Sequence, residues 1–173
     1  MFHLFHAILL HLLFLSTLAQ KPRIDDGDYA ISLLVRNGNF SGWLSMNVSD
    51  AQSDAAIIGI DNREPGFIPT FWSVQRTPGT MNYTISNNTL TNGRHVVGND
   101  SNGFVAGIPS ASAESGQWGI QEVGDDKNAY VIGNNDFSLV WTVQPPIDDQ
   151  ASIMAYKPNE GSSNQVWLFK KQP

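Results

Sequence analysis

Short runs of β-branched and aromatic residues alternate with clusters of Gly, Pro, Asn, Asp and Ser along most of the chain. Runs of this kind, bounded by turn residues, are typical of β-strands. Beyond residue 19, apolar residues do not recur at helical spacing over any long window,. The pattern therefore predicts an all-β protein whose strands are joined by turns such as Arg36-Asn37-Gly38-Asn39,.

One sequence phrase occurs three times. It opens with Tyr-x-Ile and closes with Trp, one residue, and an aliphatic or aromatic residue. The opening and closing residues of the three copies are Tyr29 and Trp72, Tyr83 and Trp118, and Tyr130 and Trp167. In the three copies the closing Trp follows the opening Tyr by 43, 35 and 37 positions, and such a period indicates a repeat architecture,. We place the repeats at about 27–76, 81–122 and 128–171,.

Each repeat contains four predicted strands, which makes twelve in all, with no long helix,. Three four-stranded repeats of this length predict a β-trefoil, a six-stranded barrel capped by a triangle of hairpins. A propeller also uses four strands per repeat, but it needs at least four repeats. The closing tryptophans are expected to fill the barrel core, one from each repeat.

The first 19 residues are apolar and end in small residues, Thr17 and Ala19, at the spacing of a cleavage site. This pattern predicts a secretory signal peptide at 1–19, too short for a membrane span. The alternative is a buried N-terminal helix, although the apolar run has no polar face. The remaining residues, 20–173, suit one domain with its own core. We therefore expect a secreted, extracellular protein.

Composition excludes several kinds of partner and site. The formal net charge is −6, so nucleic acid and anionic membranes are poor partners,. No cysteine is present, which excludes disulfides, thiolate metal sites and a cysteine nucleophile,. Only one of the four histidines, His95, lies outside the predicted signal peptide. A histidine metal cluster within one chain is therefore excluded, and no cofactor is expected.

Five Asn-x-Ser/Thr sequons accompany the predicted signal peptide, so the sequence predicts a glycoprotein with these turns at the surface. Their asparagines are Asn39, Asn47, Asn82, Asn87 and Asn99. The alternative is that some of these sequons arise by chance in a chain rich in Asn, Ser and Thr.

The polar residues do not form a recognisable catalytic set. His95 has no neighbouring nucleophile and orienting carboxylate in the sequence, as a catalytic base needs,. The pairs Asp25-Asp26, Asp125-Asp126 and Asp148-Asp149 are adjacent, whereas glycosidase carboxyls face each other across a bond,. These pairs are more simply solvated turn charges, and we predict a protein that is not an enzyme.

Trp43 and Trp141 lie in predicted second strands, and the second repeat has Arg94-His95-Val96-Val97 there instead. An indole absent from one repeat suits a sugar site, because the CH groups of a pyranose stack on aromatic faces. The alternative is that both indoles fill the barrel.

Two arginines in predicted loops, Arg63 and Arg76, present the side chain that a trypsin-like protease accepts. Lys157 is less suitable, because Pro158 follows it. The alternative for each arginine is an ordinary surface charge.

The sequence resembles the single-domain β-trefoil lectins of basidiomycete fungi, within the ricin-B-like group. The resemblance runs from Gly27-Asp28-Tyr29-Ala30-Ile31 to the last strand, and Gln165-Val166-Trp167 fits the Gln-x-Trp signature of ricin-type repeats. Fungal β-trefoil inhibitors of serine proteases share the fold and a similar Tyr-x-Ile rhythm. The resemblance therefore implies glycans or glycoproteins as partners, or a serine protease.

In these lectins the sugar site lies in the second repeat and takes fucosylated glycans that contain N-acetylglucosamine. The resemblance implies a carbohydrate site here at the matching positions, with Trp118 as the stacking aromatic. Those positions are His95, Val96, Ser115, Gly116, Gln117 and Trp118. The inhibitor alternative instead uses a loop that carries Arg76 or Arg63.

Overall fold

The computed structural model describes the chain in segments that together contain twelve β-strands and no helix. The described residues are 24–34, 42–47, 56–61, 71–87, 95–99, 103–109, 116–123, 128–144, 151–158, 162 and 164–173. The predicted signal peptide lies outside them. The strands are β1 (Gly27–Leu33), β2 (Trp43–Asn47), β3 (Ala56–Asp61), β4 (Phe71–Arg76), β5 (Asn82–Asn87), β6 (His95–Asn99), β7 (Val105–Pro109), β8 (Gln117–Glu122), β9 (Ala129–Gly133), β10 (Val140–Val143), β11 (Ile153–Tyr156) and β12 (Trp167–Lys171).

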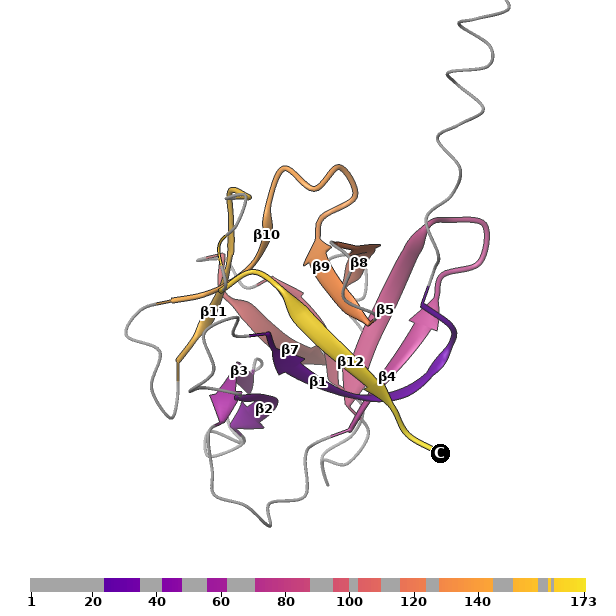
Figure 1. Cartoon of the computed structure of the whole chain (residues 1–173), viewed down its shortest axis with the longest axis horizontal. Helices are drawn as coiled ribbons and strands as arrows, with labels where there is room; N and C mark the ends of the chain where they lie inside the picture. Colours follow the sequence, from indigo (N-terminus) through magenta and orange to yellow (C-terminus); the bar gives the residue numbers. More distant parts are fainter. Residues whose placement is uncertain are drawn as a thin grey trace, which may run out of the picture.

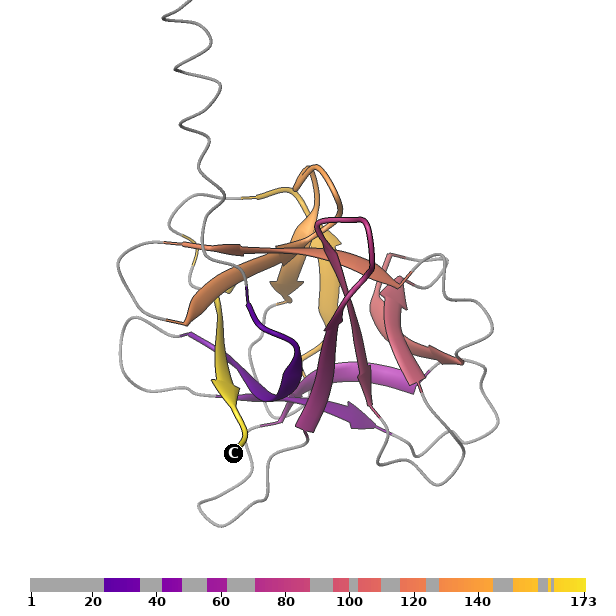
Figure 2. The same ribbon diagram turned by 90° about the vertical axis from the view of Figure 1, so that its right-hand side faces the viewer.

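Six of the described strands close into a barrel. Each of these strands pairs antiparallel with the next in the order β1, β4, β5, β8, β9 and β12, and β12 pairs with β1 to close the barrel (Figure 1). The other six form the hairpins β2–β3, β6–β7 and β10–β11, which meet through β3–β7 pairing and a bridge between Phe104 and Met154 (Figure 2). This is the predicted β-trefoil. Closure leaves the barrel strands no open edge.

The closing tryptophans fill the core and tie each hairpin to the barrel. Trp72, Trp118 and Trp167 are each at most 2% exposed. Their indole Nε1 groups donate to the backbone oxygens of Leu44, Val97 and Trp141 at 3.0, 2.7 and 3.4 Å. Because the three bonds are equivalent, Leu44, Val97 and Trp141 occupy the same position in their repeats.

This equivalence corrects the sequence alignment of Trp43 with Trp141. In the strand register, Trp43 lies opposite Ser32 of β1. The residues at the same position in the second and third repeats are Val96, which lies opposite Ser86, and Val140, which lies opposite Gly133. Trp141 is one position further along its strand. Successive strand residues face opposite sides, so the two indoles point in opposite directions.

Trp141 lies in the centre of the core, fully buried. Its ring makes edge contacts with Trp118 and Trp167 at centroid distances of 5.1 and 5.9 Å. Of the two interpretations open for this residue, the barrel-filling one is confirmed, and a sugar-stacking role is wrong. Trp43 is half-buried.

Ile24, just before β1, packs into the core, whereas the following Asp25 and Asp26 are exposed. Ile24 is 6% exposed and belongs to the core cluster. The Tyr83 hydroxyl donates to the Ile24 backbone oxygen at 3.0 Å, and the Tyr29 hydroxyl donates to the Asp25 oxygen at 2.7 Å. Two buried tyrosines therefore clamp the residues that precede β1. Within the described part of the chain, no helix is long and apolar enough to cross a membrane.

Candidate functional site

The six residues that the resemblance assigns to a sugar site do not form one open surface. Trp118 and Val96 are 2% and 3% exposed, and Gly116 is also buried. The Trp118 indole contacts Trp141 and donates to Val97, so the core occupies it and it offers no stacking face to a ligand. The side chain of His95 and the whole of Ser115 lie outside the described residues. Gln117 is half-buried and faces outward, opposite in direction to Trp118,.

The three repeats differ most clearly at the position that follows each closing tryptophan. In the register, Ser73 faces Ser86 between β4 and β5, and Leu168 faces Ser32 between β12 and β1. The third junction pairs Gly119 of β8 with Gly133 of β9. Of the three equivalent pairs, only that of β8 and β9 therefore has no side chain on the outer face of the barrel.

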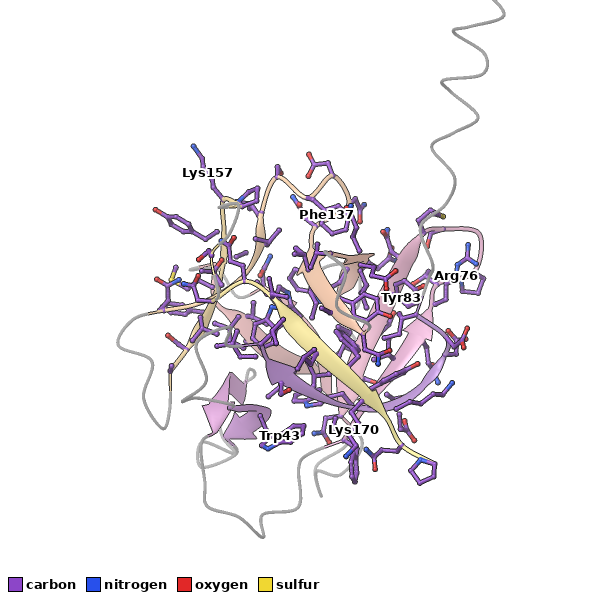
Figure 3. The ribbon with its side chains drawn as sticks, in the orientation of Figure 1. Trp43, Arg76, Tyr83, Phe137, Lys157 and Lys170 are labelled. Atoms are coloured by element: carbon purple, nitrogen blue, oxygen red, sulfur yellow. The ribbon has the colours of Figure 1, made fainter. Side chains whose placement is uncertain are left out.

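The aromatic ring of Phe137 fills this space. A Cβ atom added to Gly119 would lie 2.7 Å from Cζ and 2.9 Å from Cε2 of the ring. A Cβ atom added to Gly133 would lie 2.9 Å from Cδ1 of the same ring and 2.7 Å from the Leu139 backbone oxygen. Because these contacts are so short, a Cβ atom at Gly119 would displace the Phe137 ring, and one at Gly133 would also displace the Leu139 backbone. The ring therefore lies directly on the backbone of both strands (Figure 3).

Phe137 itself has an unusual backbone, with φ at 54°. This left-handed conformation costs about 1–2 kcal/mol for a residue with a Cβ atom. Non-glycine residues in this region persist where the surrounding structure holds them, and they cluster at functional sites. The conformation of the loop 134–139 therefore places this ring over the two glycines.

Hydrogen bonds within the loop hold the conformation. The Phe137 N–H donates to the Asn134 oxygen at 3.0 Å, and the Asn134 N–H donates to the Leu139 oxygen at 3.0 Å. Asn134 also accepts the Leu139 N–H through Oδ1 at 3.1 Å and donates from Nδ2 to Ser138 Oγ at 2.9 Å. The loop is therefore rigid and its aromatic side chain is preorganised.

Asp136 adds a charge beside the ring. Its Oδ1 accepts the Ser138 hydroxyl at 2.7 Å and the Ser138 N–H at 3.0 Å. These hydrogen bonds lower the pKa of the exposed Asp136 carboxyl below its ordinary value, so it is ionised at neutral pH. A carboxylate has about four lone-pair positions, and Ser138 uses two of them. Asp136 is therefore an exposed, ionised acceptor on this loop.

Two amide side chains continue the same outer face. Asn82 of β5 is the register partner of Gly119, so Asn82, Gly119 and Gly133 form a row across three strands with a spacing of about 5 Å,. Asn82 Nδ2 donates to Gln117 Oε1 at 3.5 Å. The Phe137 ring extends from Gly133 toward Gly119, so its Cζ end points along the row toward Asn82. We call this surface of Asn82, Gln117, Gly119, Gly133 and Phe137 the Phe137 platform.

The sequence interpretation included Gln117 in the sugar site and Asn82 as a sequon, but it assigned no role to Gly119, Gly133 or Phe137. The available signal was the pair of glycines where the other repeats have Ser or Leu. Nothing in the sequence indicated that Phe137 lies over both.

Arg76 and Arg63 were the residues proposed for an inhibitory loop. Arg63 lies outside the described residues. Arg76 is exposed at the end of β4, and its Nε donates to the Thr80 oxygen at 3.1 Å. Its backbone N–H donates to Asp26 Oδ1 at 2.8 Å, and the next N–H, of Thr77, donates to the Asn82 oxygen at 2.8 Å. The Arg76–Thr77 bond is therefore held in a tight β-hairpin.

The sequons differ in accessibility. Asn82 and Asn99 are half-buried, whereas Asn87 is 1% exposed in β5. The Asn87 side chain has no space for an attached glycan in this fold, whereas Asn88 and Thr89 of the same sequon lie outside the described residues. Asn39 and the side chain of Asn47 lie outside the described residues. Among the described residues, no three His, Asp or Glu side chains gather to hold a metal ion.

Neither protein-family models nor curated protein sequences give a match to this chain. Solved structures of similar fold include a salivary protein of Culex quiquefasciatus, with 17% identity and a TM-score of 0.64, covering 88% of this chain and 99% of that one. A proteinase inhibitor from Coprinopsis cinerea has 14% identity and a TM-score of 0.64, with coverages of 86% and 99%.

A lectin from Polyporus squamosus, in complex with a sialylated trisaccharide, has 18% identity and a TM-score of 0.58. The match covers 87% of this chain and 50% of the lectin chain. At these identities the comparisons establish the β-trefoil fold alone. They include both a lectin and a protease inhibitor, so function has to be argued from the site.

Proposed function

We propose that this protein is a secreted, lectin-like carbohydrate-binding β-trefoil that binds a saccharide at the Phe137 platform. The observation that carries the proposal is the half-buried Phe137 ring, held in a strained conformation over Gly119 and Gly133. Strain of this kind at a rigid, partly exposed aromatic is typical of a binding site. The proposal describes a binding protein and not an enzyme.

The chemistry of the platform suits a pyranose. An aromatic ring offers a face or edge to the CH groups of a sugar, as a large apolar surface with specific geometry. The amides of Asn82 and Gln117 supply both donors and acceptors for hydroxyl groups. Asp136 supplies an ionised acceptor on the adjoining loop. Because this carboxylate repels anions and the chain carries a net charge of −6, a neutral saccharide is favoured over a sialylated or sulfated one,.

The similar folds support this interpretation without specifying the sugar. The Polyporus squamosus lectin was solved with Neu5Aca2-6Galb1-4GlcNAc, which is an acidic glycan. Since fold does not fix specificity, a neutral ligand here is compatible with that likeness. Secretion remains part of the proposal and is motivated by the apolar segment 1–19,.

The test is glycan-array binding followed by calorimetry on unglycosylated protein. Phe137→Asn removes the ring and keeps a residue type that tolerates the left-handed conformation. Phe104→Asn is the matched control, because Phe104 is a partly exposed phenylalanine on another face, 37% exposed. We expect Phe137→Asn to lower affinity about tenfold or more, which is about 1.4 kcal/mol, and Phe104→Asn to leave it unchanged. Absence of binding to every glycan, or equal binding by Phe137→Asn, would overturn the proposal.

A second candidate is inhibition of a trypsin-like serine protease through Arg76. Its support is the exposed arginine on an ordered hairpin and the likeness to the Coprinopsis cinerea inhibitor. The hydrogen bonds of the Arg76 and Thr77 N–H groups, to Asp26 Oδ1 and the Asn82 backbone oxygen, count against it, because a protease must pair with the backbone there,. Titration of trypsin with up to a stoichiometric amount of this protein tests whether it inhibits the protease. Unchanged trypsin activity, or equal inhibition by Arg76→Ala, rejects this candidate.

A further inference from the structure

We propose that an N-glycan attached to Asn82 lies on the Phe137 ring and closes the platform, so that occupancy of this sequon regulates saccharide binding. This inference rests on the proposed function. It identifies Asn82 as both a platform residue and a modification site. The ligand in this case is the protein's own innermost N-acetylglucosamine.

The orientation of Asn82 permits the modification. Tyr83 points into the core and is 1% exposed, so its neighbours Asn82 and Thr84 face outward,. Asn82 and Thr84 are half-buried, and together with Tyr83 they form the sequon. Asn87, on the same strand, is buried and has no such freedom. Of the two sequons on β5, the structure therefore leaves only that of Asn82 open to a glycan.

The platform geometry directs the glycan toward Phe137. Asn82 adjoins Gly119 in the register, and the Cζ end of the Phe137 ring lies over Gly119. The adjoining strands are about 5 Å apart, so a sugar ring linked to Asn82 reaches the aromatic ring. The Asn82–Gln117 hydrogen bond is long, at 3.5 Å, compared with the usual 2.7–3.2 Å, so releasing Nδ2 costs little,.

The linkage is formed from a polyprenyl-pyrophosphate oligosaccharide donor. A bond forms between Asn82 Nδ2 and C1 of the innermost sugar, while the bond from C1 to the pyrophosphate oxygen breaks. One Nδ2 proton is released together with the lipid pyrophosphate. Because the sugar is transferred to the chain before it folds, the glycan is in place when the platform forms.

Tethering explains why the glycan excludes other sugars. A group held on a short flexible linker has an effective concentration on the order of millimolar at its neighbouring site. An external monosaccharide with millimolar affinity must compete with that tethered sugar. Occupied protein is therefore expected to bind external saccharide about twofold more weakly than bare protein.

The experiment compares three proteins secreted from eukaryotic cells, with occupancy measured by mass spectrometry. They are the parent, Thr84→Val, which removes the Asn82 sequon and preserves Asn82, and Ser101→Ala, which removes the Asn99 sequon as the control. Bacterially produced parent supplies a fourth, bare form. We expect Thr84→Val and the bare parent to bind about twice as tightly as the occupied parent, with Ser101→Ala resembling the occupied parent.

A second readout is independent of external binding. N-acetylglucosamine protons stacked on an aromatic ring show upfield NMR shifts, which we expect in the occupied parent and not in Phe137→Asn. An unmodified Asn82 in the secreted parent, equal saccharide binding with and without the glycan, or shifts that persist in Phe137→Asn would each overturn the inference. If no form binds any saccharide, the proposed function fails, and the upfield shifts alone then decide whether the glycan lies on Phe137.

Discussion

Gly119 and Gly133 face each other across β8 and β9, and the single ring of Phe137 lies against both. The equivalent positions of the other repeats hold serine or leucine side chains. At this position the barrel therefore has one aromatic ring supplied by a loop in place of two strand side chains. This packing distinguishes the β8–β9 pair from the equivalent strand pairs β4–β5 and β12–β1.

The first prediction concerns Gly119→Ala. The new Cβ atom would lie 2.7 Å from Phe137 Cζ, so the ring must move away from the strand. We expect a loss of about 1–3 kcal/mol in the free energy of unfolding, as in other overpacked sites, and weaker saccharide binding. Denaturant unfolding and calorimetry measure the two effects.

The control for Gly119→Ala is Ser73→Ala, the equivalent position in the first repeat. Ser73 already has a Cβ atom, so this change adds no steric conflict, and a shift within about 0.5 kcal/mol is expected. Gly119→Ala protein that matched the parent in stability and binding would contradict the placement of the Phe137 ring.

The second prediction separates Trp141 from Trp43. Trp141→Leu introduces the residue found at the equivalent position in the first repeat, Leu44, but it empties part of a fully buried core. We expect a destabilisation of about 3 kcal/mol. Trp43→Leu should cost less, because Trp43 is only half-buried.

Saccharide binding provides the second measurement for this pair. Folded Trp141→Leu protein should bind with parental affinity, because its indole has no exposed face. A selective loss of binding in Trp141→Leu, without loss of stability, would restore the sugar-stacking interpretation of Trp141.

The third prediction is a loss of stability at alkaline pH. Burial raises the pKa of Tyr29, and the Asp25 carboxylate raises it further; burial and then Glu122 raise the pKa of Tyr130. The folded protein therefore favours the neutral phenols. This contribution is fully present below the unfolded pKa of about 10 and is lost as the pH rises through the folded pKa values.

Urea unfolding at about pH 8 and about pH 11 measures this effect. Tyr130→Phe is expected to reduce the difference between the two pH values, since it removes one of the two groups. Tyr29→Phe should also cost stability at pH 8, because the Tyr29 hydroxyl donates to the Asp25 oxygen. A free energy of unfolding that stayed constant over this range would refute the prediction.

The fourth prediction contrasts two glutamines that stand before closing tryptophans. Gln165 is 5% exposed, and its Nε2 donates to Thr142 Oγ1 and to the Lys157 oxygen, both at 2.9 Å. Gln165→Ala removes these bonds and is expected to cost about 1–3 kcal/mol of stability without changing affinity. Gln117→Ala, on the Phe137 platform, should change stability little and weaken saccharide binding. Unfolding and binding curves that showed the reverse assignment would exclude Gln117 from the site.

Much of the fold follows from the sequence. The Tyr-x-Ile and Trp repeats predict a β-trefoil, and the structure places all three closing tryptophans in the core. The register of Trp43 and Trp141 was harder to predict. Both lie in short apolar runs, and a shift of one residue reverses the face of a strand, so only the pairing with Ser32 and Gly133 separates them,.

The sequence alone determined the threefold barrel, because its information is local: alternating strands, turn residues and a large aromatic at a fixed phase of each repeat. Tertiary structure alone decided where the candidate site lies. Asn82, Gly119 and Phe137 belong to different strands and a loop, and they meet only when β5, β8 and β9 pair in one register. The space over two glycines that Phe137 fills is a property of those contacts, and no single stretch of the chain encodes it.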